Sequence, residues 1–199
     1  MLAVVVSISS CKKDEPNDPN PEVPFFIEFD VNGATERYES DKNGYGNGPG
    51  RRTLTDDDHW GQSEFTLFGR EGTDPDSLKN SIIMEIVRLF NDSPNFNTVF
   101  NFWEIGGKNY GMWNADSTNG STEGVVFTYT DETGKVWSSG LLYGVQDSSN
   151  FEVTAHKAVS DEQYNGITEG TFNCQFHDGQ GNSLVITEGS FKARTVQDI

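Results

Sequence analysis

Hydrophobic and polar residues alternate along much of the chain with a period of two, beginning at Phe25. Residues 25–31 carry a hydrophobic side chain at every odd position, and Asn32-Gly33 follows as a turn signal before a second arm that ends at Tyr38. Such alternation is typical of half-buried antiparallel strands. It recurs at residues 63–70, 125–129 and 151–155. The pattern predicts an all-β domain, an antiparallel β-sandwich or barrel with little helix.

One segment, residues 77–90, fits two patterns. Four of its apolar residues share one face of a helix that Asp76 could cap: Leu78, Ile82, Ile86 and Leu89. However, residues 82–87 are mostly β-branched, and Asp-Pro and Ser-Pro turn signals bound the segment. These features favour a buried strand over a helix.

Two long segments, residues 39–62 and 104–124, follow neither period. Both are rich in glycine, asparagine and aspartate. We therefore expect loops in these regions. Loops of this length are uncommon in compact domains, so they are usually functional, or they contain an element that the pattern does not reveal.

Two nearly identical hexapeptides, ITEGTF ending at Phe172 and ITEGSF ending at Phe191, flank a polar turn near the end of the chain. A loop at residues 179–181 closes a hairpin between them, because Gly181 can adopt a positive φ. The resulting register gives two apolar pairs: Phe176 with Leu184, and Cys174 with Ile186. We expect Cys174 to be an inert core thiol.

Within each hexapeptide, isoleucine and phenylalanine are five residues apart, which puts them on opposite faces of a regular strand. A bulge at Gly170 and another at Gly189 would restore a common face. In this register Glu169 and Glu188 each lie opposite the phenylalanine of the other copy, so the carboxylates are offset along the hairpin. We interpret them as solvated scaffold residues, and a glycosidase-like acid–base pair stays the alternative.

The first residues form a short apolar run, 2–8, followed by Ser9-Ser10-Cys11. The run is too short to span a bilayer. It resembles the lipobox of bacterial lipoproteins, and the sequence SCKKDE resembles the start of mature lipoproteins of the Bacteroidetes type. The resemblance implies cleavage before Cys11 and diacylation of its sulfur. It also implies that Asp14-Glu15 can act as a surface-export signal.

Three regions follow from this interpretation. Residues 1–10 are a lipoprotein signal peptide. Residues 11–24 carry the lipidated cysteine and a disordered tether rich in proline and aspartate, which buries too little apolar surface to fold. Residues 25–199 form a single all-β domain. The expected location is the outer membrane, with the domain facing the cell exterior and the anchor as its membrane contact.

The end of the chain carries a second resemblance. Gly170-Thr171-Phe172, a polar turn and then Val185-Ile186-Thr187 with Gly189 and Phe191 resemble the ending of small Bacteroidetes-type surface lipoproteins. Phe29, Val31 and Asn32-Gly33 also resemble the opening of that group. These proteins belong to domain-of-unknown-function families with an all-β fold. The resemblance implies that fold and supplies no catalytic residues.

Charge narrows the range of partners. The chain has 14 Lys and Arg residues against 31 Asp and Glu residues, a net charge of -17. Nucleic acid is excluded as an expected partner, because phosphate binding needs clustered cations. No motif points to a cofactor. The cluster Asp56–His59 could supply metal ligands, but a solvated acidic loop is the favoured interpretation.

Aromatic residues in the glycine-rich segments are the candidate ligand-binding residues: Tyr45, Trp60, Tyr110 and Trp113, of which Trp60, Tyr110 and Trp113 are the principal three. Such rings are common in glycan and protein recognition, although they can instead cover the open ends of a core. The favoured hypothesis is a binding or interaction module with a glycan or protein ligand. The alternatives are a structural component of a surface complex and, less favoured, a hydrolase acting on an extracellular glycan.

Overall fold

The computed structural model describes residues 24–56, 59–70, 79–90, 102–112, 121–140, 144–159 and 166–196. Within residues 54–60 only the backbone is considered. Cys11, the predicted signal peptide and nearly all of the predicted tether therefore lie outside the described residues.

The described residues form eleven β-strands and no helix, which confirms the all-β prediction. There is accordingly no helix in them that is long and apolar enough to cross a membrane. The strands are β1 (Phe26–Val31), β2 (Ala34–Glu39), β3 (Tyr45–Asp56), β4 (His59–Arg70), β5 (Ser81–Phe90), β6 (Gly106–Lys108), β7 (Gly124–Thr130), β8 (Val136–Ser138), β9 (Asn150–Ala158), β10 (Gly166–His177) and β11 (Ser183–Thr195).

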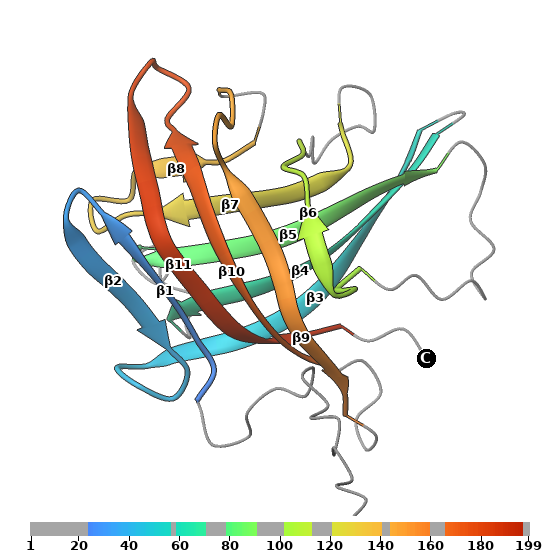
Figure 1. The fold of residues 1–199 in the computed structure, drawn as a ribbon, viewed down its shortest axis with the longest axis horizontal. Coiled ribbons are helices and arrows are strands. Elements are labelled where there is room, and N and C mark those ends of the chain that lie inside the picture. Colours follow the sequence, from blue (N-terminus) through green and yellow to red (C-terminus); the bar gives the residue numbers. More distant parts are fainter. Residues whose placement is uncertain are drawn as a thin grey trace, which may run out of the picture.

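The strands belong to one antiparallel sheet with the order β2-β1-β11-β10-β8-β7-β5-β4-β3, and β9 and β6 branch from β10. Figure 1 shows β9, β10 and β11 crossing over β3, β4, β5 and β7, with β1 and β2 at one side, so the sheet wraps into a nearly closed barrel. The pair His177–Ser138 joins the two halves on one side. On the other side, the Arg194 N–H donates to the side-chain oxygen of Asn47 at 2.5 Å, which brings β11 against β3.

Aromatic rings fill the barrel interior. Every inward-facing residue of β10 from Phe172 onward is buried, and so are most inward-facing residues of the neighbouring strands. Phe127 and Phe172 stack with their centroids 4.6 Å apart. Phe29 meets Tyr129 edge to face at 5.7 Å. The core therefore extends from the middle of the sheet toward the end of the barrel where Tyr129 lies.

Local signals predict two elements correctly. The first hairpin turns at Asn32 and Gly33, both with positive φ (53° and 79°), and Val31 pairs with Ala34. The ambiguous segment is a strand over residues 81–90, as favoured, and its inward residues are fully buried between β4 and β7.

The terminal hairpin also has the predicted register near its turn, where Phe176 pairs with Leu184 and Cys174 with Ile186. Gly181 has the predicted positive φ, 96°. Cys174 is a free thiol and only 2% exposed. Burial raises its pKa, and this agrees with an inert core residue.

Beyond the turn, the predicted pairing is wrong by one residue. β11 has an extra residue opposite Asn173, so Phe172 pairs with Gly189 and Glu169 pairs with Lys192. The residue in the left-handed conformation at this bulge is Glu188, with a φ of 52°, rather than the glycine after it. The bulge in ITEGSF is therefore real, and it displaces every pair beyond it.

The bulge predicted at Gly170 does not exist in β10. Pairing with β11 is regular from Gly166 to Phe172, so Ile167 faces away from Phe172. The irregularity opposite Gly170 lies instead in β9, where Thr154 is the extra residue. Identical sequence motifs thus have different backbones in the two arms.

Residues 39–62 and 104–124 are not simple loops, which corrects the prediction. The first contains β3, which pairs residue by residue with β4 from Tyr45–Arg70 to Asp56–His59. The second contains β6, which pairs with β9, and Tyr110, which forms a parallel bridge with Val125. The strands in these glycine-rich stretches show no hydrophobic alternation, because the residues at their inward positions are largely small or polar.

Candidate functional site

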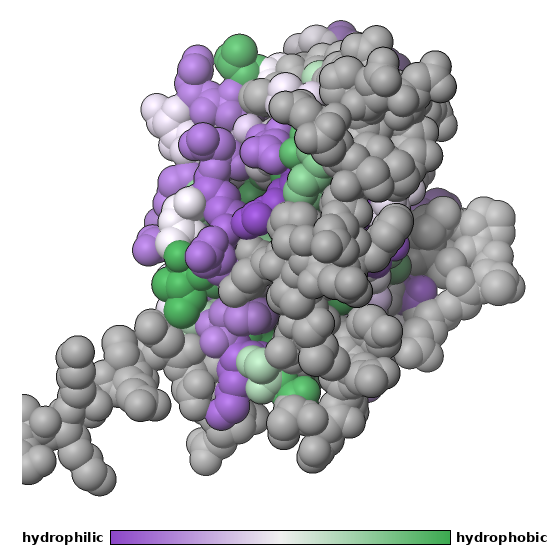
Figure 2. All heavy atoms as spheres, turned by 90° about the vertical axis from the view of Figure 1, so that its right-hand side faces the viewer, coloured by the Kyte–Doolittle hydropathy of each residue, from purple (hydrophilic) through white to green (hydrophobic). Residues whose placement is uncertain are grey.

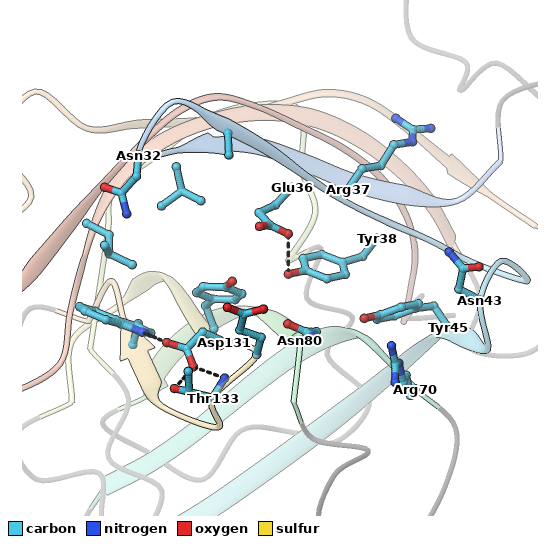
Figure 3. Close-up of a pocket in the computed structure, with 16 residues that line it drawn as sticks. Asn32, Glu36, Arg37, Tyr38, Asn43, Tyr45, Arg70, Asn80, Asp131 and Thr133 are labelled. Atoms are coloured by element: carbon cyan, nitrogen blue, oxygen red, sulfur yellow. Dashed lines mark hydrogen bonds between the residues drawn. The ribbon is translucent and has the colours of Figure 1, made fainter.

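A pocket of about 800 Å³ lies at one end of the barrel, between β2 above and the ends of β4, β5 and β7 below (Figure 3). We call it the mouth pocket. Pockets of this size commonly hold small ligands, and barrel mouths are a frequent place for them. The lining residues are Val31, Asn32, Ala34, Glu36, Arg37, Tyr38, Asn43, Tyr45, Arg70, Asn80, Tyr129, Asp131, Glu132, Thr133, Trp137 and Leu184.

Tyrosine rings form the inner wall of the mouth pocket. Tyr38 and Tyr129 are 3% and 5% exposed, and the Tyr38 hydroxyl donates to the Glu36 carboxylate at 3.3 Å. The Tyr38 ring lies 5.3 Å from that of Tyr45. Burial raises the pKa of both Tyr38 and Tyr129, so at neutral pH these hydroxyls stay protonated and can donate hydrogen bonds.

Asp131 organises the turn between β7 and β8. One carboxylate oxygen accepts from the Thr133 N–H, the Thr133 hydroxyl and the Lys135 N–H, at 2.9, 2.6 and 3.0 Å. The other accepts from the Trp137 indole N–H at 2.9 Å. Burial alone would raise the pKa of Asp131, but these donors outweigh burial and lower it, so Asp131 stays charged.

Three asparagines stand around the rim, at turns rather than in strands. Asn32, Asn43 and Asn80 have φ values of 53°, 55° and 53°. Asparagine tolerates this left-handed conformation better than most residues, which explains its presence at each turn. Their side chains border the pocket (Figure 3), and each amide offers both donors and acceptors to a ligand.

Two arginines line the mouth pocket but differ in orientation. Arg37 points away from it (Figure 3) and lies 3.0 Å from both Glu28 and Glu39 on the outer face. Arg70 lies at the rim with its guanidinium 5.6 Å from the centre of the Tyr45 ring. Arg70 is therefore the only arginine of the lining set that faces the pocket.

The described surface elsewhere is mainly hydrophilic. Figure 2 shows this for the face at the right of Figure 1, where the coloured atoms are mostly hydrophilic and the hydrophobic ones lie in separate places. The exposed large hydrophobic residues of the described part come from separate segments: Ile105, Val136, Val145 and Val185. Isolated apolar residues of this kind need no functional explanation.

Of the three principal candidate aromatics, Tyr110 can be placed in full. Its ring is 8% exposed, and its hydroxyl donates to the backbone carbonyl of Asn173 at 2.9 Å, with a longer contact to that of Asn150. Tyr110 is thus a core residue that ties β10 to the segment after β6. In this position its ring does not face a ligand.

The other sequence candidates are only partly described. Trp60 belongs to β4 and pairs with Thr55 and Phe90, and its side chain is outside the described part. Trp113 lies outside the described residues altogether. In the Asp56–His59 cluster, the two end residues pair across the β3–β4 hairpin. No group of three or more potential metal ligands exists among the described residues.

The two glutamates of the repeat do not face each other. Glu169 lies opposite Lys192, with its carboxylate 3.8 Å from the ammonium group. Glu188 is exposed at the bulge. The expected offset of the two carboxylates along the hairpin is confirmed, although the residues opposite them differ from those expected.

Comparison with known proteins gives no relative. The chain matches no protein-family description, no curated protein and no solved structure. The candidate site therefore depends on its own geometry.

Proposed function

We propose that this protein is an outer-membrane lipoprotein, anchored through Cys11 and facing the cell exterior, whose β-domain binds a small polar ligand in the mouth pocket. The observation that carries the binding role is the pocket itself, with tyrosine rings inside and amides and carboxylates at the rim. The lipobox resemblance supports the anchor. The pocket replaces the loop aromatics as the favoured binding site.

A structural role in a surface complex is the second candidate, because β2 and β3 end the sheet and each pairs on one side in the described part of the chain. A free edge can accept a strand from a partner. However, β3 contains Pro49 and Arg52, and β2 contains Arg37. Proline and charged residues on edge strands discourage strand addition, so the binding role is favoured.

The anchor is tested by growing cells with a clickable fatty acid. We expect the wild-type protein to be labelled and Cys11→Ala to be unlabelled. Surface exposure is tested on the same cells with external protease, which should degrade the wild-type domain without cell lysis. Equal labelling of both proteins would overturn the anchor, and resistance to protease until lysis would overturn the outward orientation.

Binding is tested with a matched pair of tryptophan variants on β2. Ala34 lines the mouth pocket, whereas Thr35 lies on the opposite face of the strand. Ala34→Trp should fill the pocket, and Thr35→Trp should leave it open. We expect a panel of saccharides and organic amines to include a compound that raises the Tm of the wild type and of Thr35→Trp but not of Ala34→Trp. A panel with no such compound would overturn the proposed site.

A further inference from the structure

The electrostatic balance of the mouth pocket identifies the class of ligand. Three carboxylates line it, those of Glu36, Asp131 and Glu132. Arg37 is turned outward and paired with Glu28 and Glu39, so it does not neutralise them. Arg70 is the one arginine of the lining set that faces the pocket, so three carboxylates stand against a single guanidinium. An anionic ligand would meet a negative site in a protein that is itself strongly acidic.

Two of these carboxylates have no cationic partner among the described residues. Glu36 accepts a long hydrogen bond from the neutral Tyr38 hydroxyl, and Glu132 is exposed in the β7–β8 turn. Nearby acidic residues differ, because Glu28, Glu39 and Asp178 each contact an arginine or a lysine. Among the carboxylates that border the cavity, Glu36 and Glu132 are thus available to a ligand.

The negative charges of the three carboxylates all act on one residue of the inner wall, Tyr129. Burial raises the pKa of the Tyr129 hydroxyl, and the negative charges of Glu36, Asp131 and Glu132 raise it further. All three line the same pocket as Tyr129. A positive charge placed there would interact favourably with all of them at once.

The aromatic walls also favour a cation. The Arg70 guanidinium lies over Tyr45, and the Lys135 ammonium lies 4.1 Å from the centre of the Trp137 ring. Tyrosine and tryptophan faces attract cations, and aromatic cages are common sites for ammonium groups. These two faces are occupied by the protein's own cations, and they show that rings around the mouth pocket attract positive charge.

We propose that the ligand of the mouth pocket is an organic cation, an amine or quaternary ammonium compound, whose charge is held by Glu36 and Glu132 against the tyrosine wall. This inference depends on the proposed binding function. A neutral saccharide would use the rim amides but would leave both carboxylates without a counter-charge. The cation satisfies both sets of groups.

The test is calorimetric titration of the full-length protein with choline, cadaverine and spermidine, together with 3,3-dimethylbutan-1-ol, the neutral isostere of choline. We expect at least one amine to bind and the alcohol to bind at least tenfold more weakly than choline if choline is the ligand. Glu36→Gln and Glu132→Gln should each weaken amine binding about tenfold. Glu28→Gln removes the same charge from the outer face and should change affinity less than twofold.

The outcomes separate this inference from the proposed function. Amine binding that is blocked by Ala34→Trp and weakened by Glu36→Gln supports both. Pocket-dependent binding of neutral saccharides alone would overturn the cation and keep the binding site. An equal effect of Glu28→Gln and Glu36→Gln would also overturn it, because the charge would then act at long range. Binding of neither class would overturn both proposals.

Discussion

The ring of Phe191 covers Gly170 on the neighbouring strand so closely that a Cβ added there would lie 2.6 Å from a ring carbon and would also overlap the Glu152 carbonyl oxygen. The arrangement is reciprocal, because the Phe172 ring covers Gly189 in the same way. Each repeated hexapeptide thus supplies a glycine that the phenylalanine of the other needs. The repeat is a packing device of the terminal hairpin.

Gly170→Ala should therefore destabilise the fold. The added methyl group meets backbone on one side and a buried ring on the other, and overpacking of this kind costs about 1–3 kcal/mol. Gly48→Ala in β3 is the control, because a Cβ there meets nothing within 4 Å, and its effect should stay within about 0.5 kcal/mol. Urea unfolding of both variants measures the difference. Equal stability of the two variants would contradict the packing role.

The sequence predicts those parts of the fold that short-range signals determine. Asn32-Gly33 and the loop at 179–181 set the register of their hairpins, because turn geometry fixes which residues pair. The same reasoning fails past the bulge in β11. Its position is predictable from the odd spacing of Ile186 and Phe191, but the left-handed conformation of Glu188 is not, because asparagine or glycine is the usual residue there.

The sequence does not reveal β3, because contacts with other residues of the barrel, rather than a hydrophobic pattern of its own, keep this strand in the sheet. Gly50 lies under the ring of Phe65. The side-chain amide of the inward Asn47 donates a hydrogen bond to the Thr66 hydroxyl at 2.5 Å. Arg51 is exposed and pairs with the buried Glu64. A strand with glycine and polar residues at these positions shows no hydrophobic alternation. Its assignment requires knowledge of β4, with which it pairs along its whole length.

The mouth pocket is not predictable because its residues meet only when the barrel closes. Tyr38 lies at the end of a predicted strand arm and Tyr129 in another, and nothing in the sequence connects them. Asn32 and Asn80 look like ordinary turn residues. Of the two loop aromatics whose side chains the structure describes, Tyr45 reaches the pocket, whereas Tyr110 points into the core.

Asp131→Ala should destabilise the β7–β8 turn, because it removes four hydrogen bonds to Thr133, Lys135 and Trp137. We expect a loss of about 1–3 kcal/mol at neutral pH. Since the pKa of Asp131 is lowered on folding, its ionic contribution is present above the ordinary value of 3.8 and is lost as the pH falls through the folded value. The difference in the free energy of unfolding between wild type and variant should therefore become smaller below pH 3.8.

Chemical unfolding at pH 7 and pH 3, followed by circular dichroism, measures this difference in stability. Glu132→Ala is the neighbouring control. It removes an exposed carboxylate from the same turn and should change stability by less than about 0.5 kcal/mol at either pH. A loss in Glu132→Ala as large as in Asp131→Ala would show that general turn charge, rather than these bonds, stabilises the hairpin.

Glu85 should make the free energy of unfolding depend on pH in the opposite sense to Asp131. It is 5% exposed, accepts a hydrogen bond from Ser63 at 2.5 Å and lies 3.8 Å from Arg52. Burial raises its pKa above the ordinary value of 4.5, so the folded protein binds this proton more tightly than the unfolded chain. The free energy of unfolding therefore falls as the pH rises from 4.5 through the folded value.

Glu85→Gln should remove this dependence while an amide oxygen still accepts from Ser63. Relative to the wild type, the variant should be more stable at pH 8 than at pH 4. The exposed Glu152→Gln is the control and should keep the wild-type pH profile. Unfolding curves between pH 4 and pH 8 provide the measurement. If the stability of Glu85→Gln changed with pH in parallel with that of the wild type, Glu85 would not be the cause of this pH dependence.

Tyr110→Phe should loosen the barrel where the segment after β6 crosses to β10. The change keeps the buried ring but removes the hydroxyl that bonds the Asn173 carbonyl, at a cost of about 0.5–1.5 kcal/mol. Cys174 lies beside this hydroxyl and, as a buried thiol of raised pKa, should react with a thiol reagent only when the region opens. In a Cys11→Ala background, where Cys174 is the sole thiol, Tyr110→Phe should increase the reaction rate several-fold. Tyr45→Phe, which alters a half-buried ring at the pocket, should leave the rate unchanged, and similar rates in all three proteins would refute the role assigned to the Tyr110 hydroxyl.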